Sequence, residues 1–160
     1  MVVVSDSSVI TGLLAINKLY LLQNLFHNVL LTPTVYSELS TLEKYNYPIE
    51  DINTSWINVK GIKDYKKLQS LKLELDLGEA ESIVLALEEK ADYLLVDEKK
   101  GRDIAKKEGL KVIGLLGILV QAKTVGLIPL LKPEIEILTS KIEFRLHQKL
   151  IQAALDAVGE

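Results

Sequence analysis

The sequence contains no cysteine, and this absence excludes two kinds of structure. Disulfide bonds cannot form, and a zinc site built from cysteine thiolates cannot exist. Disulfides stabilise proteins of oxidising compartments, so a chain without cysteine fits a reducing one. We therefore expect a cytoplasmic protein.

The sequence also lacks a long uncharged apolar stretch. A membrane-spanning helix needs about 18 or more such residues, and the longest stretch here, residues 112–122, is shorter and contains glycines. The N-terminal apolar run has only three valines and no positively charged flank, so we expect no signal peptide. We expect a soluble chain with no membrane partner.

Positive charge is not in excess. The chain has 19 Lys and Arg against 22 Asp and Glu, a net charge of −3. This excludes a globally basic coat for nucleic acid but leaves a local basic patch possible. With 160 residues, 48% of them hydrophobic, the chain can build one sizeable core. We expect a single domain over residues 1–160, in which residues 131–160 form a C-terminal helical extension.

Short apolar runs alternate with helical patterns along the chain. This alternation predicts a central parallel sheet covered by helices on both faces. The predicted strands are residues 2–5, 29–31, 56–59, 93–96 and 112–113. The predicted helices are residues 7–24 with a break near Asn17, 33–42, 63–73, 78–90, 99–108, 114–125, 133–140 and 145–158. Residues 43–53 are predicted to be the longest loop.

Two aspartates follow predicted strands. Asp6 ends the valine run of MVVVSD, and Asp97 ends the strand in ADYLLVD. Ligand sites of open parallel sheets gather at the carboxyl ends of the strands, so the two carboxylates converge if the strands are neighbours. Taken alone, each aspartate is better explained as the N-cap of the helix that follows it.

Two glutamates strengthen the case for a site. Glu38 borders the apolar stripe of the helix that begins at Pro33, and Glu79 lies on the stripe of the helix that begins at Gly78. Glu81 falls on the opposite, solvated face. Favourable interaction with the helix dipole explains an acid in the first turn, but it does not explain why Glu79 faces inward.

Four carboxylates that meet at one place would repel one another, and a divalent cation relieves that repulsion. The candidate ligands are Asp6, Glu38, Glu79 and Asp97, all oxygen donors, which favours Mg²⁺ or Mn²⁺ over zinc. Sites of this kind commonly perform phosphoryl chemistry, with the metal activating water against a phosphodiester. The sequence therefore predicts that these four acids are both metal ligands and catalytic residues.

Four segments in this order resemble the PIN-domain superfamily, in particular a prokaryotic branch related to VapC-type toxin nucleases. They are DSSVI, TPTVYSEL, LGEAESIVLALE and ADYLLVDEKKGRDIAKKEGLKVIGLLGIL, and the resemblance extends from Val2 to about Pro133. It implies a three-layer α/β/α sandwich with a central parallel sheet, followed here by C-terminal helices. It also implies a metal-dependent ribonuclease with its acids at one end of the sheet.

The resemblance assigns the family's four acids, in order, to Asp6, Glu38, Glu79 and Asp97. Ser8 matches a hydroxyl residue that steadies the first aspartate in the family. Many relatives carry aspartate at the third position, where this chain has Glu79 with one more methylene. The resemblance further implies RNA as substrate, an antitoxin protein as a possible partner, and a homodimer, for which residues 115–120 and the tail could supply an interface.

Basic and aromatic residues near these motifs are candidates for RNA contacts. Lys99, Lys100 and Arg102 follow Asp97 closely and could bind phosphates. Further along the helix, Lys106 and Lys107 are better explained as a solvated face. Three aromatic residues of the long loop and its flanks could stack on bases, although such residues more often pack as a lid or an interface: Tyr45, Tyr47 and Trp56. We expect both histidines, His27 and His147, at the surface, and Glu98 to be a solvated helix-start residue.

Two other functions are compatible with parts of the pattern. A receiver-like phosphoacceptor domain also places aspartates at strand ends, but it needs an acidic pair after the first strand and a lysine where KVIGLLG has glycine. A catalytically weak or inactive PIN-fold binding module would keep the fold without turnover, and Glu79 in place of aspartate favours it. RNA cleavage with added metal separates these hypotheses.

Overall fold

The computed structural model describes residues 1–141 and 145–160. Its centre is a five-stranded sheet in the order β3-β2-β1-β4-β5, and every neighbouring pair is parallel. The strands are β1 (Val3–Ser5), β2 (Val29–Leu31), β3 (Ile57–Val59), β4 (Tyr93–Leu95) and β5 (Val112–Ile113). All five occur where the apolar runs of the sequence predict them.

Helices connect the strands, as parallel pairing requires. They are α1 (Ser7–Ala15), α2 (Tyr20–Phe26), α3 (Pro33–Ser40), α4 (Tyr65–Leu71), α5 (Leu77–Glu88), α6 (Lys99–Lys107), α7 (Leu115–Thr124), α8 (Lys132–Lys141) and α9 (Gln148–Ala157). The predicted break near Asn17 is confirmed: Asn17 lies between α1 and α2 with a φ of 56°.

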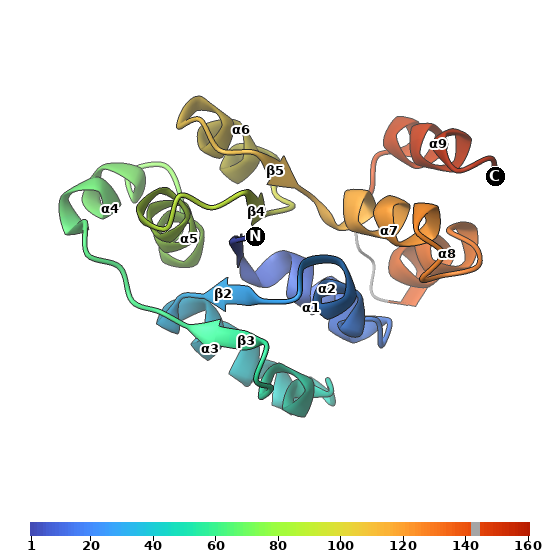
Figure 1. Ribbon diagram of the computed structural model, residues 1–160, viewed down its shortest axis with the longest axis horizontal. Helices are drawn as coiled ribbons and strands as arrows, with labels where there is room; N and C mark the ends of the chain where they lie inside the picture. The colour runs from blue at the N-terminus through green and yellow to red at the C-terminus, as the bar shows by residue number, and fades with distance from the viewer. Residues whose placement is uncertain (142–144) are drawn as a thin grey trace.

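The two faces of the sheet bury different sets of side chains, because successive residues of a strand point to opposite faces. Val3 and Leu95 pack in a core with α1, α2, α3 and α7, whereas Val4 and Leu94 pack in a second core with α4, α5 and α6. Figure 1 shows the two groups of helices on opposite sides of the strands. The predicted α/β/α sandwich is confirmed.

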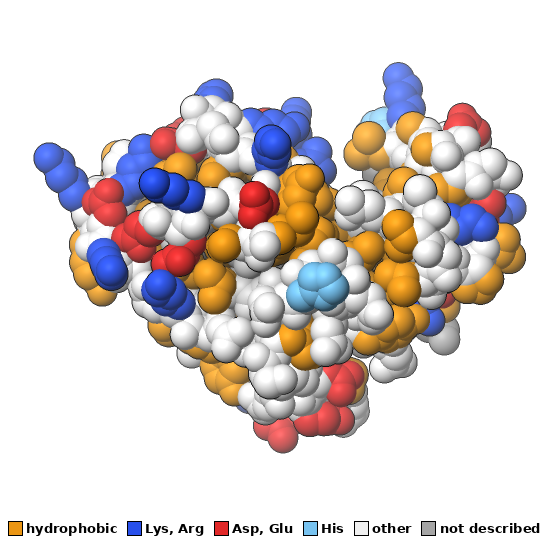
Figure 2. All heavy atoms as spheres, in the orientation of Figure 1, with side chains coloured by type: hydrophobic (Ala, Val, Ile, Leu, Met, Phe, Trp, Pro, Cys, Tyr) orange, Lys and Arg blue, Asp and Glu red, His pale blue; other side chains and the backbone are white. Residues whose placement is uncertain are grey.

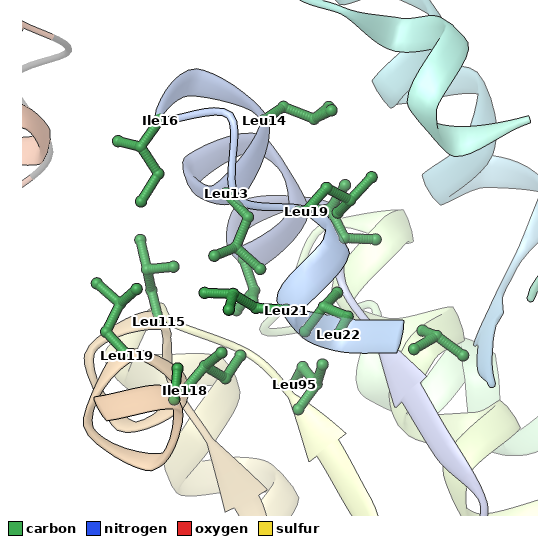
Figure 3. Close-up of a cluster of buried hydrophobic side chains, with 14 of the residues drawn as sticks. Leu13, Leu14, Ile16, Leu19, Leu21, Leu22, Leu95, Leu115, Ile118 and Leu119 are labelled. Carbon is green, nitrogen blue, oxygen red and sulfur yellow. The ribbon is translucent and has the colours of Figure 1, made fainter. Parts of the chain in front are cut away.

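The larger core lies between α1, α2 and α7. Figure 3 shows Leu13 of α1, Leu22 of α2 and Ile118 of α7 pointing into the same space, beside Leu95 of β4. All four are completely buried. This core fixes the end of β4, and α9 packs on the outside of α7.

Two predicted segments differ in the structure. Residues 43–53, expected to be a plain loop, contain most of two short 3₁₀ helices, η1 (Thr41–Tyr45) and η2 (Ile49–Ile52). The last helix begins at Gln148 instead of residue 145, because His147 acts as its N-cap: Nδ1 of the imidazole accepts a hydrogen bond from the backbone N–H of Lys149 at 3.2 Å.

Across the described ranges, 1–141 and 145–160, every helix is too short or too polar to cross a membrane.

Candidate metal centre at the carboxyl end of the sheet

Asp6 and Asp97 lie at the same edge of the sheet. Asp6 directly follows β1 and Asp97 follows β4 by one residue, and these two strands are neighbours in the register Ser5 to Leu95. The backbone N–H of Asp6 donates to the carbonyl of Leu95 at 2.9 Å, which extends the ladder to the aspartate itself. The sheet therefore brings together the two strand ends that the sequence singled out.

Asp6 is buried, with only 3% of its surface exposed. It occupies the N-cap position of α1, yet its side chain makes no capping hydrogen bond, so capping does not explain it. Burial, with smaller contributions from Asp76, Glu38 and Glu98, raises the pKa of Asp6 to about 7, although a hydrogen bond from the Ser7 backbone opposes the shift. Charging this carboxyl group thus costs free energy in the folded chain.

Glu79 is held in the first turn of α5. The helix begins at the N-cap Asp76, whose Oδ1 accepts the backbone N–H of Glu79 at 2.9 Å. Glu79 is only 6% exposed, and its Oε2 is buried without a hydrogen-bond partner among the described residues. Burial raises the pKa of Glu79 to about 8, and a hydrogen bond between the side chains of Glu79 and Asp76, together with the charge of Asp76, acts in the same direction. An orphaned carboxylate oxygen of this kind is expensive unless a ligand compensates it.

Three glycines of the sequence motifs make room for three of the acids. A Cβ atom on Gly78 would lie 2.5 Å from Oε1 of Glu38, and one on Gly101 would lie 2.6 Å from Oε2 of Glu79. A Cβ on Gly114 would lie 2.9 Å from Oδ1 of Asp97. The glycines of LGEAE, KKGR and VIGLL therefore form niches in which the carboxylates rest.

Asp97 is half-buried, and its side chain stabilises the start of α7. Its Oδ1 accepts the backbone N–H of Leu115 at 3.1 Å, so Asp97 caps α7, whose own N-cap residue is Gly114. Burial raises the pKa of Asp97, whereas the Leu115 hydrogen bond and the charge of Arg102 lower it. The hydrogen bond uses one of the two carboxylate oxygens, which leaves the other for a ligand.

The remaining predicted residues lie around this edge in different environments. Glu38 is exposed on α3, and Glu98 is exposed at the start of α6, as expected. Ser8 does not make the expected contact with Asp6, because its Oγ is buried without a hydrogen-bond partner. Glu81 is half-buried, with Oε2 inaccessible, and so does not lie on a fully solvated face.

Among the basic candidates, Lys99 and Arg102 line a cavity together with Asp97, and Arg102 is half-buried. Lys100 is exposed and is not part of that lining. Lys106 and Lys107 are exposed on the same helix, in agreement with the solvated face predicted for them.

The predicted aromatic residues lie at the other end of the sheet. Trp56 precedes β3, is 9% exposed and packs in the larger core. Tyr45 and Tyr47 line a cavity of about 390 Å³ with Leu14 and Ala15 from the end of α1. None of the three is near the carboxyl ends of β1 and β4, so their packing fits the structural interpretation better than stacking on a base at the acids.

Sequence reasoning missed one acid of this edge, Asp76. It is exposed, and its charge raises the pKa of both Asp6 and Glu79. The segment DLGE carries the pattern of an N-cap aspartate followed three residues later by glutamate, and this pattern could have placed Asp76 next to Glu79 before the structure was known.

The acids gather at one edge without converging on one point. Within residues 1–141 and 145–160, no three His, Asp or Glu side chains are arranged so that they could hold a metal ion together. The donor set nevertheless fits a hard divalent cation, because all the donors are carboxylate oxygens and the buried Oε2 of Glu79 has no partner.

Comparison with known proteins identifies the class. The model of the family DUF3368, described as a PIN domain, matches residues 2–160, and the chain belongs to this family. PIN domains are typically nucleases and generally use divalent metals, so family membership indicates nuclease activity. A receiver-like domain is not supported.

One solved structure with a similar fold is a PilT N-terminus domain protein from the hyperthermophilic archaeon Sulfolobus solfataricus P2. It shares 20% sequence identity at a TM-score of 0.48, over 76% of this chain and 93% of that chain. No curated protein matches the sequence.

Proposed function

We propose that the protein is a Mg²⁺- or Mn²⁺-dependent endoribonuclease related to the VapC-type toxins. The observation that supports this most is the pair Asp6 and Glu79, two buried carboxyl groups of raised pKa at one edge of the sheet, one of them with an orphaned oxygen. Buried carboxyl groups with strongly raised pKa values lower the stability of the fold, and such groups are concentrated at functional sites.

Asp6 and Glu79 would hold the metal, with the free oxygen of Asp97 and the carboxylate of Glu38 as further ligands. Strand β1 fixes the direction of Asp6, and the Asp76 cap fixes the first turn of α5, so both backbones are rigid. A divalent cation bound there would supply the charge that activates water for in-line attack on a phosphodiester and stabilises the leaving oxygen. Lys99, Lys100 and Arg102 would neutralise phosphates of the RNA near this edge.

The test is cleavage of single-stranded and structured RNA with added Mn²⁺. Asp6→Asn keeps the size of the side chain, and we expect it to lower the cleavage rate by at least about 100-fold, the upper value for residues that only orient a metal ligand. Asp92→Asn is the matched control, because Asp92 is an exposed aspartate directly before β4, at the other end of the sheet. Cleavage that survives both EDTA and Asp6→Asn would overturn the proposal.

A binding or assembly module without turnover is the second candidate. It is favoured by the lack of a converged three-acid group in the described ranges, 1–141 and 145–160. Absence of cleavage on every RNA tested, with the metal bound, would support it over the nuclease.

The partners proposed from the resemblance are an antitoxin and a second copy of the chain. Leu115, Ile118 and Leu119 of α7 are buried within the chain, so a homodimer would need other surfaces than the apolar face of this helix. Sedimentation equilibrium tests the dimer, and a purely monomeric protein would contradict it. Growth arrest on expression, relieved by a co-expressed neighbouring gene product, tests the toxin assignment.

A further inference from the structure

A segment from the far end of the chain lies beside the acid edge. Residues 145–147, which we call the arm, precede α9. Arg145 and His147 of the arm, with Leu146 and Leu150, line one side of a cavity of about 510 Å³. The residues on its other side are Asp97, Glu98, Lys99 and Arg102. Figure 2 shows this part of the surface as an indentation between α6 and α9 in the upper outline of the molecule.

Positive charge enters the cavity from both sides. Lys99 and Arg102 come from the first turn of α6, and Arg145 comes from the arm. Among residues 1–141 and 145–160, none of these three side chains forms an ion pair within 4.0 Å. The carboxylates of Asp97 and Glu98 lie on the same wall, and the charge of Arg102 acts on Asp97, so the three cations leave a small excess of positive charge for an anionic ligand.

His147 supplies a further donor. Its Nδ1 accepts the backbone N–H of Lys149 at 3.2 Å. A neutral imidazole that accepts at Nδ1 carries its proton on Nε2, so the ring presents an N–H donor in addition to its capping bond. The cap also ties the arm to α9, which packs on α7.

An apolar groove adjoins the basic cavity. It has a volume of about 290 Å³ and shares Asp97, Arg102, Leu146 and Leu150 with the larger cavity. Its other walls are apolar and come from α7 and α9: Leu116, Val120 and Ala154, with Gly114 and Gly117. A basic cavity beside an apolar groove matches single-stranded nucleic acid, which exposes both a phosphate chain and base faces.

We propose that the arm forms the second wall of a channel for single-stranded RNA, in which Arg145 and Nε2 of His147 donate to phosphates next to the one held at the acids. The apolar groove between α7 and α9 takes an unpaired base. This inference rests on the proposed function, and it adds two substrate-binding residues that are more than forty positions away from the basic motif.

The test is binding of a labelled single-stranded RNA by the full chain in EDTA, where no metal-dependent cleavage occurs. We expect Arg145→Gln to weaken binding about tenfold, the loss of a charged hydrogen bond. It should also reduce the slope of log K against log salt by about 0.7, the value for one phosphate of a single strand. Lys149→Gln is the matched control: Lys149 is exposed, carries the same charge and lies outside both cavities.

A histidine variant separates binding from folding. His147→Ser keeps an N-cap oxygen but removes the Nε2–H donor, so we expect roughly threefold weaker binding and an unchanged melting temperature. Double-stranded RNA should bind less tightly than the single strand, because its bases are not available to the groove.

Equal losses in Arg145→Gln and Lys149→Gln would overturn the proposal, since they indicate a diffuse charge effect. RNA affinity that neither Arg145→Gln nor His147→Ser lowers, together with tight binding of an acidic peptide by the wild type, would overturn the proposal in favour of a protein partner. If Arg145→Gln weakens binding but wild type never cleaves with Mn²⁺, the nuclease assignment fails while the channel stands. If Asp6→Asn abolishes cleavage but Arg145→Gln binds normally, the channel alone fails.

Discussion

Asp92 and Glu88 at one end of the sheet and Asp6 and Glu79 at the other lie in different environments. At the amino end, Asp92 is exposed and its Oδ2 accepts the backbone N–H of Val2 at 2.7 Å. Glu88, at the end of α5, accepts the backbone N–H groups of Lys63 and Asp64 at 2.6 and 2.7 Å. At the carboxyl end, Asp6 and Glu79 are buried, and Oε2 of Glu79 has no partner in the described part of the chain.

An unpaired oxygen alone does not single out Glu79, because Oε2 of Glu81 and of Glu134 are also buried without a partner among the described residues. Glu79 differs in having its pKa raised by burial and by the nearby Asp76 and Asp6. A carboxylate that accepts backbone N–H groups at an exposed site stabilises the fold. At Asp6 the Ser7 backbone hydrogen bond does not offset burial, and Oε2 of Glu79 has no donor, so both carboxyl groups cost stability and their presence needs another reason. We infer that the carboxyl end is the working end, and the following predictions test the contrast.

The largest expected effect comes from filling the niche behind Glu79. In Gly101→Ala, the new methyl group would lie 2.6 Å from Oε2 of Glu79 and 3.2 Å from Cγ2 of Val96, so the carboxylate must move. We expect RNA cleavage to fall about 100-fold, as for other residues that orient a metal ligand. Gly61→Ala is the control, since a Cβ there meets nothing within 4 Å. Equal RNA cleavage rates for Gly101→Ala and Gly61→Ala would contradict the claim that the space at Gly101 positions Glu79 for activity.

Asp6→Asn should stabilise the metal-free protein. Because the pKa of Asp6 rises from 3.8 to about 7 on folding, the folded chain binds more protons than the unfolded chain between these values. Stability of the wild type therefore falls as pH rises through that window, whereas the variant has no such loss. Urea unfolding in EDTA at pH 9 should show a gain of up to about 4 kcal/mol, and the gain should shrink towards pH 4. Asp92→Asn should show no gain in unfolding free energy. A similar gain in this variant would mean that the two ends of the sheet do not differ in the way proposed.

Gly78→Ala should affect activity more than stability. Its methyl group would lie 2.5 Å from Oε1 of Glu38, which is the tip of an exposed side chain that can turn away. We expect a change of less than about 1 kcal/mol in unfolding free energy and a roughly tenfold loss of cleavage. A variant with full activity would show that Glu38 is not needed at the site.

The smallest expected effect is at the amino end. Tyr45 is 72% exposed and lies beside the end of α1, so Tyr45→Ala should change RNA cleavage by less than about twofold. A loss of cleavage comparable to that of Asp6→Asn would mean that the RNA also contacts Tyr45 at the amino end of the sheet.

Much of the fold could be predicted because strand and helix patterns are local. The valine run, the Thr32-Pro33 helix start and the apolar stripes place the elements within a few residues, and Oγ1 of Thr32 does accept the N–H of Val35 at 3.2 Å. Asp6 and Asp97 could be predicted at one edge since parallel strands align their carboxyl ends.

Other features depend on contacts between distant segments. That Gly101 accommodates Glu79 follows from the approach of α6 to α5, which no spacing along the chain reveals. The position of Arg145 beside Arg102 depends on how α9 returns to α7. His147 was expected at the surface, and it is exposed; its hydrogen bond with Lys149 as the N-cap of α9 was not predicted, because histidine is not among the common N-cap residues. That residues 131–160 are an extension of one domain stays a prediction.

Calorimetric titration of the metal-free protein with Mn²⁺ measures whether Asp6 and Glu79 bind a divalent cation. We expect one or two sites with a Kd well below roughly 1 mM, lost in Asp6→Asn, strongly weakened in Glu79→Gln and unchanged in Asp92→Asn. Absence of binding up to millimolar Mn²⁺, or binding that Asp6→Asn and Glu79→Gln leave intact, would contradict a metal centre at these two residues.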